Sequence, residues 1–267
     1  MHLVGMRSVA LIVIILLTIA ARPARAQDAV PAEILYRTVP IIAGDQGGTG
    51  FFLDSQDRLY LITARHVVSS LQPCNAQVYI WFSDQWKTLT ATRVLFPDSD
   101  ADVAVLETEW TPPKPFLVPA MHELGTDGPT FGQQVWFLGY PLWSRDHPHG
   151  LSSSLAKASQ ILPFIRRGTL SAIDSTNPKS TVLYIDGINN KGFSGGPIVY
   201  WSFSAHEYRI LGVIRGYLND EYPQEWTING QKVNETVLAN SGIMIGYSIA
   251  QAVDAIKTSQ TVNQCRH

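Results

Sequence analysis

The chain has few cysteines and no excess of charge of either sign. Cys74 and Cys265 are its two cysteines among 267 residues, and its formal net charge is −2 at pH 7. In an exported protein the two thiols could form one disulfide, but sequence alone does not show whether their Cα atoms come close enough. Nucleic acids and anionic lipid surfaces select basic patches, and no such bias is present. We therefore expect neither as a partner.

Long apolar runs are equally scarce, and the chain has only one, at residues 9–21. Arg7 precedes this run and Ala24-Arg25-Ala26 follows it, which is the charge, core and cleavage pattern of a secretory signal. The run is short for a membrane span, which needs about 20 residues. We expect a signal peptide at 1–26, export to the periplasm or the extracellular space, and no stable membrane association after its removal. An uncleaved anchor is the alternative.

Helical periodicity is also rare, because most apolar segments have the length and alternation of strands. Ile249, Ala252, Val253 and Ile256 recur at helical spacing and predict one terminal helix at 248–259. Residues 110–119 contain four prolines, which is typical of a connector. Strands are expected before it at 48–54, 58–63, 78–82, 92–96 and 102–107, and after it at 134–141, 168–173, 181–186, 196–201, 209–217 and 241–248. The pattern favours an all-β fold of about six strands on either side of a linker.

Two other stretches fall outside this strand pattern. Residues 141–166 are too long for a routine connection and are interpreted as a functional loop. His147 and His149 lie within it, but two loop histidines with no nearby third ligand do not predict a metal site. Residues 234–236 read Asn-Glu-Thr, a glycosylation sequon that matters only in a host that glycosylates.

The segment "GFSGGP" at 192–197 surrounds Ser194 with glycines. A serine hydroxyl becomes a nucleophile when a histidine takes its proton and a carboxylate orients that histidine. The glycine two positions earlier allows the backbone N–H groups of Gly192 and Ser194 to converge, and such a pair stabilises an oxyanion. The pattern predicts acyl-transfer chemistry at Ser194.

A histidine and an aspartate provide the two remaining parts. His66 ends the apolar strand at 58–63, within "TARHVV", and Asp102 begins the apolar segment "DVAVL". Asp98 and Asp100 compete with Asp102 for the carboxylate role. Each residue alone is weak evidence, because histidines at strand ends and aspartates at strand starts are common in structural roles.

Together, "TARHVV", "DVAVL" and "GFSGGPIV" closely resemble the motifs of the chymotrypsin-like (trypsin-like) serine proteases. The order His, Asp, Ser is that of the family, and the similarity extends over about residues 41–258. It implies two six-stranded antiparallel β-barrels with a catalytic triad of His66, Asp102 and Ser194 between them. It also implies hydrolysis of protein or peptide substrates through an acyl-enzyme, with no cofactor. The oligomeric state is not implied.

This resemblance divides the chain into parts. We expect a signal peptide at 1–26, an N-terminal segment at 27–40 and a protease domain at 41–260. Within that domain we expect barrel 1 at about 41–110, a linker at 111–119, barrel 2 at about 120–247 and the helix at 248–259. The sequence ends soon after this helix, so no PDZ domain is expected.

Two departures narrow the branch of the family. Animal members have a cysteine beside the histidine and an aspartate before the serine, whereas here Arg65 and Val67 flank His66 and Phe193 precedes Ser194. In the animal members that aspartate pairs with a freshly cut N-terminus, which switches the enzyme on. This ion pair cannot form here, so we expect no processing beyond signal removal. The sequence is more similar to bacterial exported trypsin-like peptidases and to the Deg/HtrA protease domain.

The resemblance also places the specificity pocket. Ile188 corresponds to its base, and Arg215, Gly216 and Tyr217 to its wall, so strict preference for Lys or Arg is not expected. Two other functions compete. "GFSGG" also fits the nucleophile elbow of α/β-hydrolases, but Pro197 and the apolar run after it oppose the helix which that fold needs. A protease fold retained as a catalytically silent binding module is the second alternative.

Overall fold

The computed structural model describes residues 29–55, 58–83, 85–97, 100–110, 128–141, 162–177, 179–228 and 231–259, and residue 265. The expected signal peptide and the expected linker at 111–119 lie outside the described residues, as does most of the expected loop at 141–166. Residues from Pro31 onward form one compact unit. None of its described helices has the length and apolarity that a membrane crossing requires.

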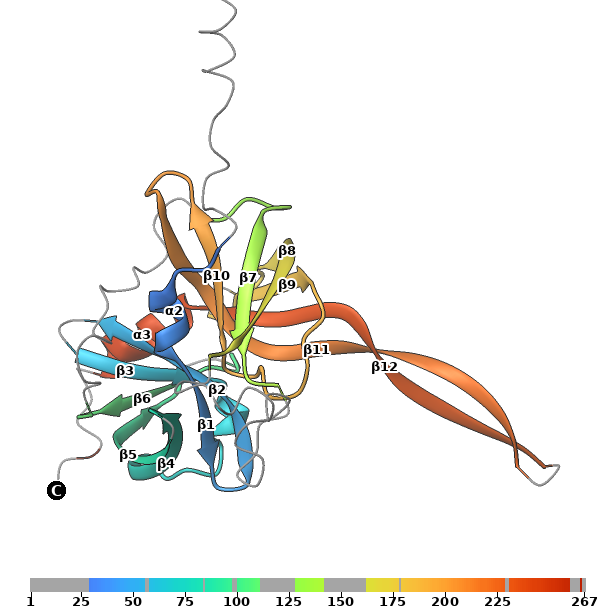
Figure 1. The fold of residues 1–267 in the computed structure, drawn as a ribbon, viewed down its shortest axis with the longest axis horizontal. Coiled ribbons are helices and arrows are strands. Elements are labelled where there is room, and N and C mark those ends of the chain that lie inside the picture. Colours follow the sequence, from blue (N-terminus) through green and yellow to red (C-terminus); the bar gives the residue numbers. More distant parts are fainter. Residues whose placement is uncertain are drawn as a thin grey trace, which may run out of the picture. The chain divides into compact units, whose positions relative to one another are not determined.

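The described residues of this unit form twelve strands, two α-helices and a short 3₁₀ turn (Figure 1). The first half contains α2 (Ala32–Arg37), β1 (Thr38–Ala43), β2 (Gln46–Ser55), β3 (Arg58–Thr63), η2 (Arg65–Val67), β4 (Cys74–Phe82), β5 (Gln85–Leu95) and β6 (Ala104–Thr108). The second half contains β7 (Gln134–Gly139), β8 (Phe164–Asp174), β9 (Val182–Asp186), β10 (Pro197–Ser202), β11 (Glu207–Ile228), β12 (Gln231–Ser248) and α3 (Ala250–Ser259).

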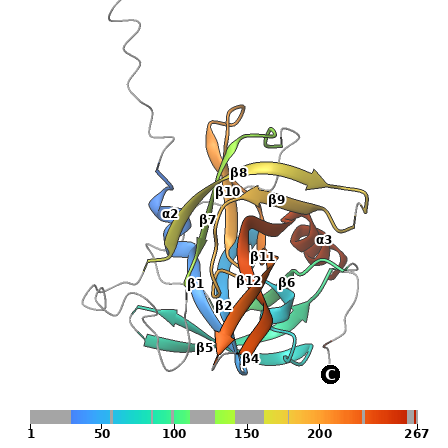
Figure 2. The same cartoon turned by 90° about the vertical axis from the view of Figure 1, so that its right-hand side faces the viewer.

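The strands close into two antiparallel barrels of six strands each. The strand order is β1-β2-β3-β6-β5-β4 in the first barrel and β10-β11-β12-β9-β8-β7 in the second, so both have the same topology. Figures 1 and 2 show the two barrels in perpendicular views, with α3 following β12. The predicted all-β fold of two six-stranded antiparallel β-barrels with a C-terminal helix is confirmed.

Alternation of side chains along the strands builds a separate core in each barrel. In β4 every second residue is buried, and Val78 and Ile80 are fully enclosed. Side chains of successive strand residues point to opposite faces, so the buried residues of β4 all point into the barrel. Strands that touch both the core and another element, such as β1 and β10, are buried almost throughout. The apolar runs in the sequence therefore correspond to the walls of the two barrels.

The N-terminal part of the domain differs from the prediction. β1 begins at Thr38, before the expected domain start at residue 41, and α2 precedes it without a break. The Thr38 hydroxyl donates to the Ile34 carbonyl at 2.9 Å, and buried Arg37 pairs with Asp54 at 2.7 Å. α2 has six residues, too few to produce a readable helical period, so sequence analysis missed it.

β11 and β12 are much longer than expected. The sequence predicted strands at 209–217 and 241–248, but the two strands continue as a pair from Asn219↔Asn240 to Ile228↔Gln231. We call residues 219–228 and 231–240 the β-arm; it extends from barrel 2 in Figure 1. Pro223 and four carboxylates obscured the strand pattern here. The Asn229-Gly230 dipeptide, typical of two-residue hairpin turns, was the available signal.

Two smaller points concern the loop and the cysteines. β8 begins at Phe164, inside the stretch 141–166 that was expected to hold no strand. Cys74 and Cys265 form a disulfide with a Cα–Cα distance of 5.8 Å, which lies in the usual range. The bridge resolves the question that the sequence left open, and it joins the start of β4 to a residue beyond α3.

Candidate active site

His66 and Asp102 form the best-defined part of the site. β3 ends at Thr63, and the turn η2 that follows carries His66 out of the barrel wall. Its ring Nδ1 lies 2.6 Å from Asp102 Oδ2, and its backbone N–H donates to Asp102 Oδ1 at 2.8 Å. Both carboxylate oxygens are therefore bound by the same residue, which fixes the ring orientation and directs Nε2 away from the aspartate. Asp102 rather than Asp100 makes these contacts, and Asp98 lies outside the described residues.

The charge of Asp102 is favoured by its surroundings. Burial alone would raise its pKa, but the hydrogen bonds and charge of His66, together with the Arg215 guanidinium, outweigh burial and hold the pKa below the ordinary value of 3.8. His66 itself has a side chain that is about half exposed, whereas the Asp102 carboxylate is mostly enclosed. An enclosed anion held against an accessible imidazole can stabilise that imidazole when it takes a proton.

Ser194 lies on a turn that only glycines can build. Gly192 and Gly195 have φ of +99° and +88°, in the left-handed region. A Cβ on Gly195 would lie 2.2 Å from the Thr49 carbonyl oxygen, so the turn is pressed against barrel 1. The Ser194 hydroxyl donates to the Arg215 carbonyl at 3.0 Å. The Ser194 side chain is thus hydrogen-bonded to β11, and the same residue of β11, Arg215, lines a pocket together with His66.

The backbone of this turn presents two N–H groups without partners. Neither Gly192 N–H nor Ser194 N–H has a hydrogen-bond acceptor in the part of the chain that the structure describes. The carbonyls of the same residues are occupied, because Thr49 Oγ1 donates to Gly192 O at 2.6 Å and Thr49 N donates to Ser194 O at 2.8 Å. With the two carbonyls held by Thr49, the N–H groups of Gly192 and Ser194 are the donors of this turn that are available to a ligand.

Thr49 was missed by sequence reasoning, and its role is to join the two barrels at the serine. Its Oγ1 also accepts from the Tyr140 N–H at 3.0 Å, and its carbonyl accepts from Thr63 Oγ1 at 2.8 Å. The Tyr140 hydroxyl donates to the Thr38 carbonyl at 2.9 Å, and complete burial raises the pKa of this phenol. "GTGFFLD" indicated only a strand, since nothing in one sequence distinguishes this threonine from other strand residues.

Phe193 anchors the same turn from the other side. Its side chain is fully buried and meets the ring of Phe137 edge-on, with 5.9 Å between centroids. A Cβ on Gly139 would lie 2.5 Å from the Phe193 ring, so β7 passes directly over it. Apolar packing therefore fills the position at which the resemblance places an activating ion pair in animal relatives.

A pocket beside the histidine brings together most of the predicted specificity residues. Arg215, Gly216 and Tyr217 line it together with His66 and Asp102. Ile188 does not line it and is 56% exposed. The next residue, Asn189, is 1% exposed; its Nδ2 donates to the Gly216 carbonyl at 3.2 Å, and its Oδ1 has no partner among the described residues. The sequence analysis assigned the base of the specificity pocket to Ile188; the neighbouring Asn189 is buried, but neither Asn189 nor Ser194 lines this pocket.

The described residues contain no group of three side chains that could hold a metal ion. His147 and His149 lie outside the described residues.

The comparisons with known proteins concern the family and the fold of the chain. The sequence profile of the trypsin-like peptidase domain matches residues 48–202. Among solved structures, the chain is similar to the inactive form of the Rv3671c protease, at 17% identity and a TM-score of 0.52 over 88% of this chain and 95% of that one. The chain is also similar to a serine-to-alanine mutant of Rv3671c from M. tuberculosis H37Rv, likewise in an inactive form. That match has a TM-score of 0.53 and 16% identity, and it covers 90% of this chain and 95% of that one.

The chain is also similar to the HtrA-type protease AlgW in complex with a tripeptide, at 17% identity and a TM-score of 0.50. That match covers 87% of this chain and 63% of AlgW. At these identities the solved structures establish the fold. No curated protein sequence matches the chain significantly.

Proposed function

Because the chain belongs to the trypsin-like peptidase family, we propose that it is a serine endopeptidase that hydrolyses peptide bonds through an acyl-enzyme. The observation that carries this proposal is the pairing of both Asp102 oxygens with His66, in the pocket bordered by Arg215, whose carbonyl holds the Ser194 hydroxyl. Ser194 is the proposed nucleophile, His66 the general base and then acid, and Asp102 the group that orients the imidazole.

The first step needs the Ser194 hydroxyl to turn from Arg215 toward His66. Rotation about the Cα–Cβ bond moves Oγ without disturbing the backbone, which Thr49 holds. Nε2 of His66 then takes the hydroxyl proton while Oγ attacks the substrate carbonyl carbon. The negative charge that develops on the carbonyl oxygen is accepted by the N–H groups of Gly192 and Ser194.

Collapse of this intermediate breaks the peptide bond. The protonated His66 gives its proton to the departing amine, and Asp102 keeps its negative charge throughout. Water then attacks the Ser194 ester, with His66 again as base, and releases the acid half of the substrate. Every proton in this sequence passes through Nε2, so the reaction needs no cofactor.

The pocket suggests which side chains the enzyme accepts. No carboxylate stands at Ile188 or Asn189, so a Lys or Arg at the cleavage site would find no counter-ion there. Arg215 is an exposed cation at the wall of the pocket beside His66, but Asp100 and Asp102 line the same pocket. We propose that the enzyme has no strict preference for Lys or Arg at the cleavage site.

The signal-like residues 1–26 and the disulfide between Cys74 and Cys265 support export to an oxidising compartment. We propose the periplasm or the extracellular space as the site of action. Packing of Phe193 in the barrel core supports activity without a newly cut N-terminus.

One observation favours the alternative of a silent binding module. The Ser194 hydroxyl is hydrogen-bonded to a backbone carbonyl instead of to His66. If this bond held the serine permanently, the fold would bind peptides without cutting them.

A cleavage profile of the mature protein on a complex peptide mixture separates the two functions. Wild type should cut and Ser194→Ala should not, with a loss of about 10⁴-fold or more in rate. Both proteins should unfold at similar temperatures, because the hydroxyl lies on a turn and not in the core. Absence of cleavage by the folded wild type between pH 6 and about 9 would establish the binding module instead.

A further inference from the structure

The β-arm is a two-stranded ribbon with one apolar face. Its cross-strand partners lie on the same face, and consecutive pairs alternate between faces. One face, which we call the apolar face, carries the pairs Tyr222↔Val237 and Trp226↔Val233, with Gln224↔Glu235 between them and Asp220↔Ala239 at the base of the arm. The opposite face carries Glu221↔Leu238, Pro223↔Thr236, Glu225↔Asn234 and Thr227↔Lys232.

This apolar face is open in the described part of the chain. Tyr222, Trp226, Val233 and Val237 are 54%, 46%, 42% and 36% exposed. Their cross-strand contacts stabilise the ribbon, yet about half of each large side chain stays accessible. An isolated two-stranded hairpin is marginally stable in water, so a surface that covers this face would also stabilise the arm.

Both edges of the ribbon are open as well. β10 pairs with β11 only up to Val213, and β9 pairs with β12 only from Ile243. Within the β-arm the two described strands pair only with each other, over ten residues of β11, or about 33 Å. Unpaired backbone N–H and C=O groups along such an edge are a template for adding an extended strand.

The β-arm starts at the candidate active site. Arg215 to Asn219 line the pocket that contains His66, and the strand then runs directly into the arm. At its base, Asn240 Nδ2 donates to the Asn189 carbonyl at 2.9 Å, and Asn189 is itself bonded to Gly216. A polypeptide that binds along β11 in the pocket and extends beyond the pocket would therefore contact the β-arm.

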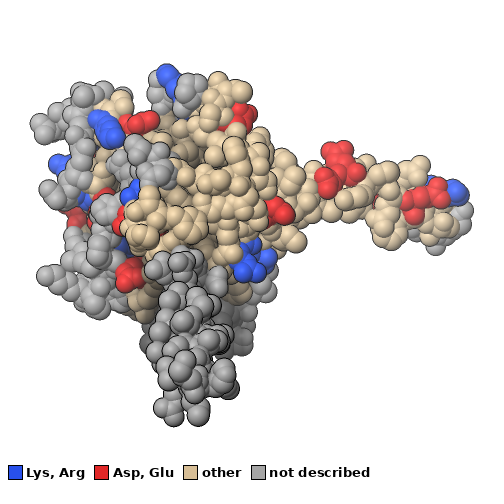
Figure 3. Space-filling view, turned by 90° about the horizontal axis from the view of Figure 1, so that it is seen from above, with Lys and Arg blue, Asp and Glu red and all other residues tan. Residues whose placement is uncertain are grey.

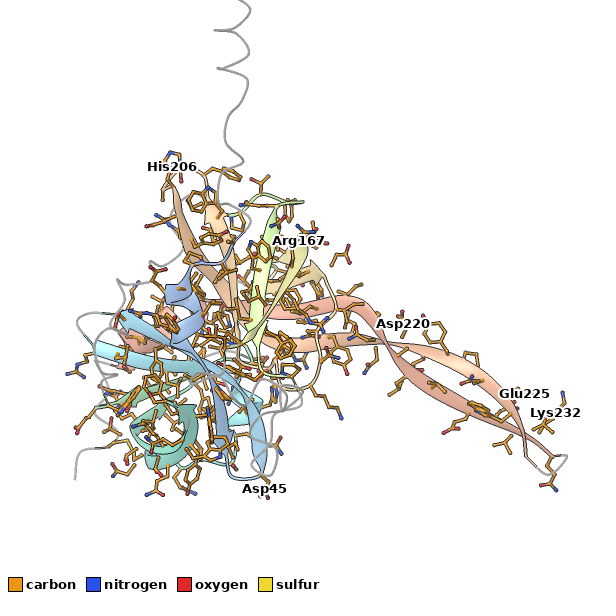
Figure 4. All side chains as sticks on the ribbon, viewed as in Figure 1. Asp45, Arg167, His206, Asp220, Glu225 and Lys232 are labelled. Atoms are coloured by element: carbon orange, nitrogen blue, oxygen red, sulfur yellow. A yellow bond between two sulfur atoms is a disulfide. The ribbon has the colours of Figure 1, made fainter. Side chains whose placement is uncertain are left out.

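The charge of the β-arm distinguishes between a second copy of the arm and a different polypeptide as its binding partner. The β-arm carries Asp220, Glu221, Glu225 and Glu235 against the single cation Lys232, which pairs with Glu225 at 2.8 Å. Figure 3 shows this excess of acidic groups along the ribbon, and Figure 4 labels Asp220, Glu225 and Lys232 on it. Two such arms would repel each other, whereas a basic chain would be attracted and a neutral chain would not be repelled.

We propose that the β-arm is an exosite for protein substrates, which binds an extended, apolar, neutral or basic segment that adjoins the cleavage site. The inference rests on the proposed endopeptidase function. It also specifies the class of substrate. An exosite of this length would increase the affinity for unfolded or extended polypeptides and would not change the affinity for short peptides.

Binding to the Ser194→Ala variant tests the exosite without requiring catalysis. The probe is reduced, carboxamidomethylated lysozyme, a permanently unfolded chain that stays basic because its blocked cysteines carry no charge, at about 0.5 M salt to screen most of the charge attraction. Tyr222→Thr with Trp226→Thr should weaken binding about tenfold or more, because aromatic anchors dominate such contacts. Threonine keeps the strand preference of these positions.

Two further variants test whether a loss of binding is specific to the apolar face. Leu238→Thr removes an exposed apolar side chain from the opposite face and should change binding less than about twofold. Val233→Thr with Val237→Thr preserves side-chain shape on the apolar face and should weaken binding in the same direction as the aromatic pair.

An equal loss for Leu238→Thr, or no loss for the apolar-face variants, would overturn the exosite. So would sedimentation showing that wild type dimerises and that the apolar-face variants are monomers, because a second copy would then be the occupant. Failure of the proposed catalysis has a different signature, namely binding of the probe by an intact exosite with no cleavage by wild type.

Discussion

At the scale of single residues, a threonine holds the turn that carries Ser194. Thr49 contacts both carbonyls of the turn, at Gly192 and Ser194, and also accepts the Tyr140 N–H. In this arrangement barrel 1 supplies the histidine and the aspartate and also fixes the shape of the serine turn, which barrel 2 carries. Phe193 and Thr49 hold the two sides of this turn.

Thr49→Val should lower kcat by about tenfold or more with a smaller effect on KM, because a turn released by about 1 Å misdirects the oxyanion donors. Steady-state kinetics on a short peptide substrate measure both constants. Thr92→Val is the matched control, since its hydroxyl donates to the Glu107 carbonyl at 3.2 Å within barrel 1. Equal losses of kcat in the two variants would show that Thr49 has only a structural role.

Asp102 should make folding stability depend on pH. Its pKa is lowered from 3.8 in the folded protein, so the ionised carboxylate adds stability above the pKa of the unfolded chain. This contribution is lost as the pH falls through the folded pKa, below about 4. Urea unfolding at several pH values should show a wild-type curve that falls more steeply in this acid range than that of Asp102→Asn. Parallel curves would contradict the assignment.

At the scale of secondary structure, the apolar runs predicted strands well and their connections poorly. "RLYLIT" matched β3, and "QVWFLGYP" matched β7 except for its last two residues, because a strand that faces a barrel core needs continuous or alternating apolar residues. The β-arm was missed because its strands face solvent on both sides, so Glu221 and Glu225 occupy positions where a barrel strand would be apolar. The short α2 helix carried no usable period.

The disulfide joins two distant elements and should stabilise the fold. Cys74 opens β4 and Cys265 lies beyond α3, at a sequence separation of 191 residues. Closing so long a loop restricts the unfolded chain, so the double change Cys74→Ser with Cys265→Ser should cost about 2–4 kcal/mol of unfolding free energy. Urea denaturation with and without reductant measures this cost. Reductant should shift wild type but not the double variant; identical midpoints for both would show that the bridge contributes nothing.

At the scale of the whole molecule, two barrels of the same topology contribute different parts of one candidate site. His66, Asp102 and Thr49 come from the first barrel, and Ser194 and Arg215 from the second. Three sequence motifs predicted the three catalytic candidates because together they resemble those of the trypsin-like proteases, although His66 or Asp102 alone was weak evidence. They did not predict Thr49 or Asn189, whose roles depend on which strands the fold brings together.

The central claim is that Ser194 is an activated nucleophile, and labelling with a fluorophosphonate tests it most directly. The reagent reacts covalently with serines whose proton can pass to a base, and peptide mapping by mass spectrometry identifies the modified residue. We predict a single modification at Ser194 in wild type, and none in Ser194→Ala or His66→Ala. Modification of a different residue, or an unmodified Ser194 in folded protein, would contradict the account.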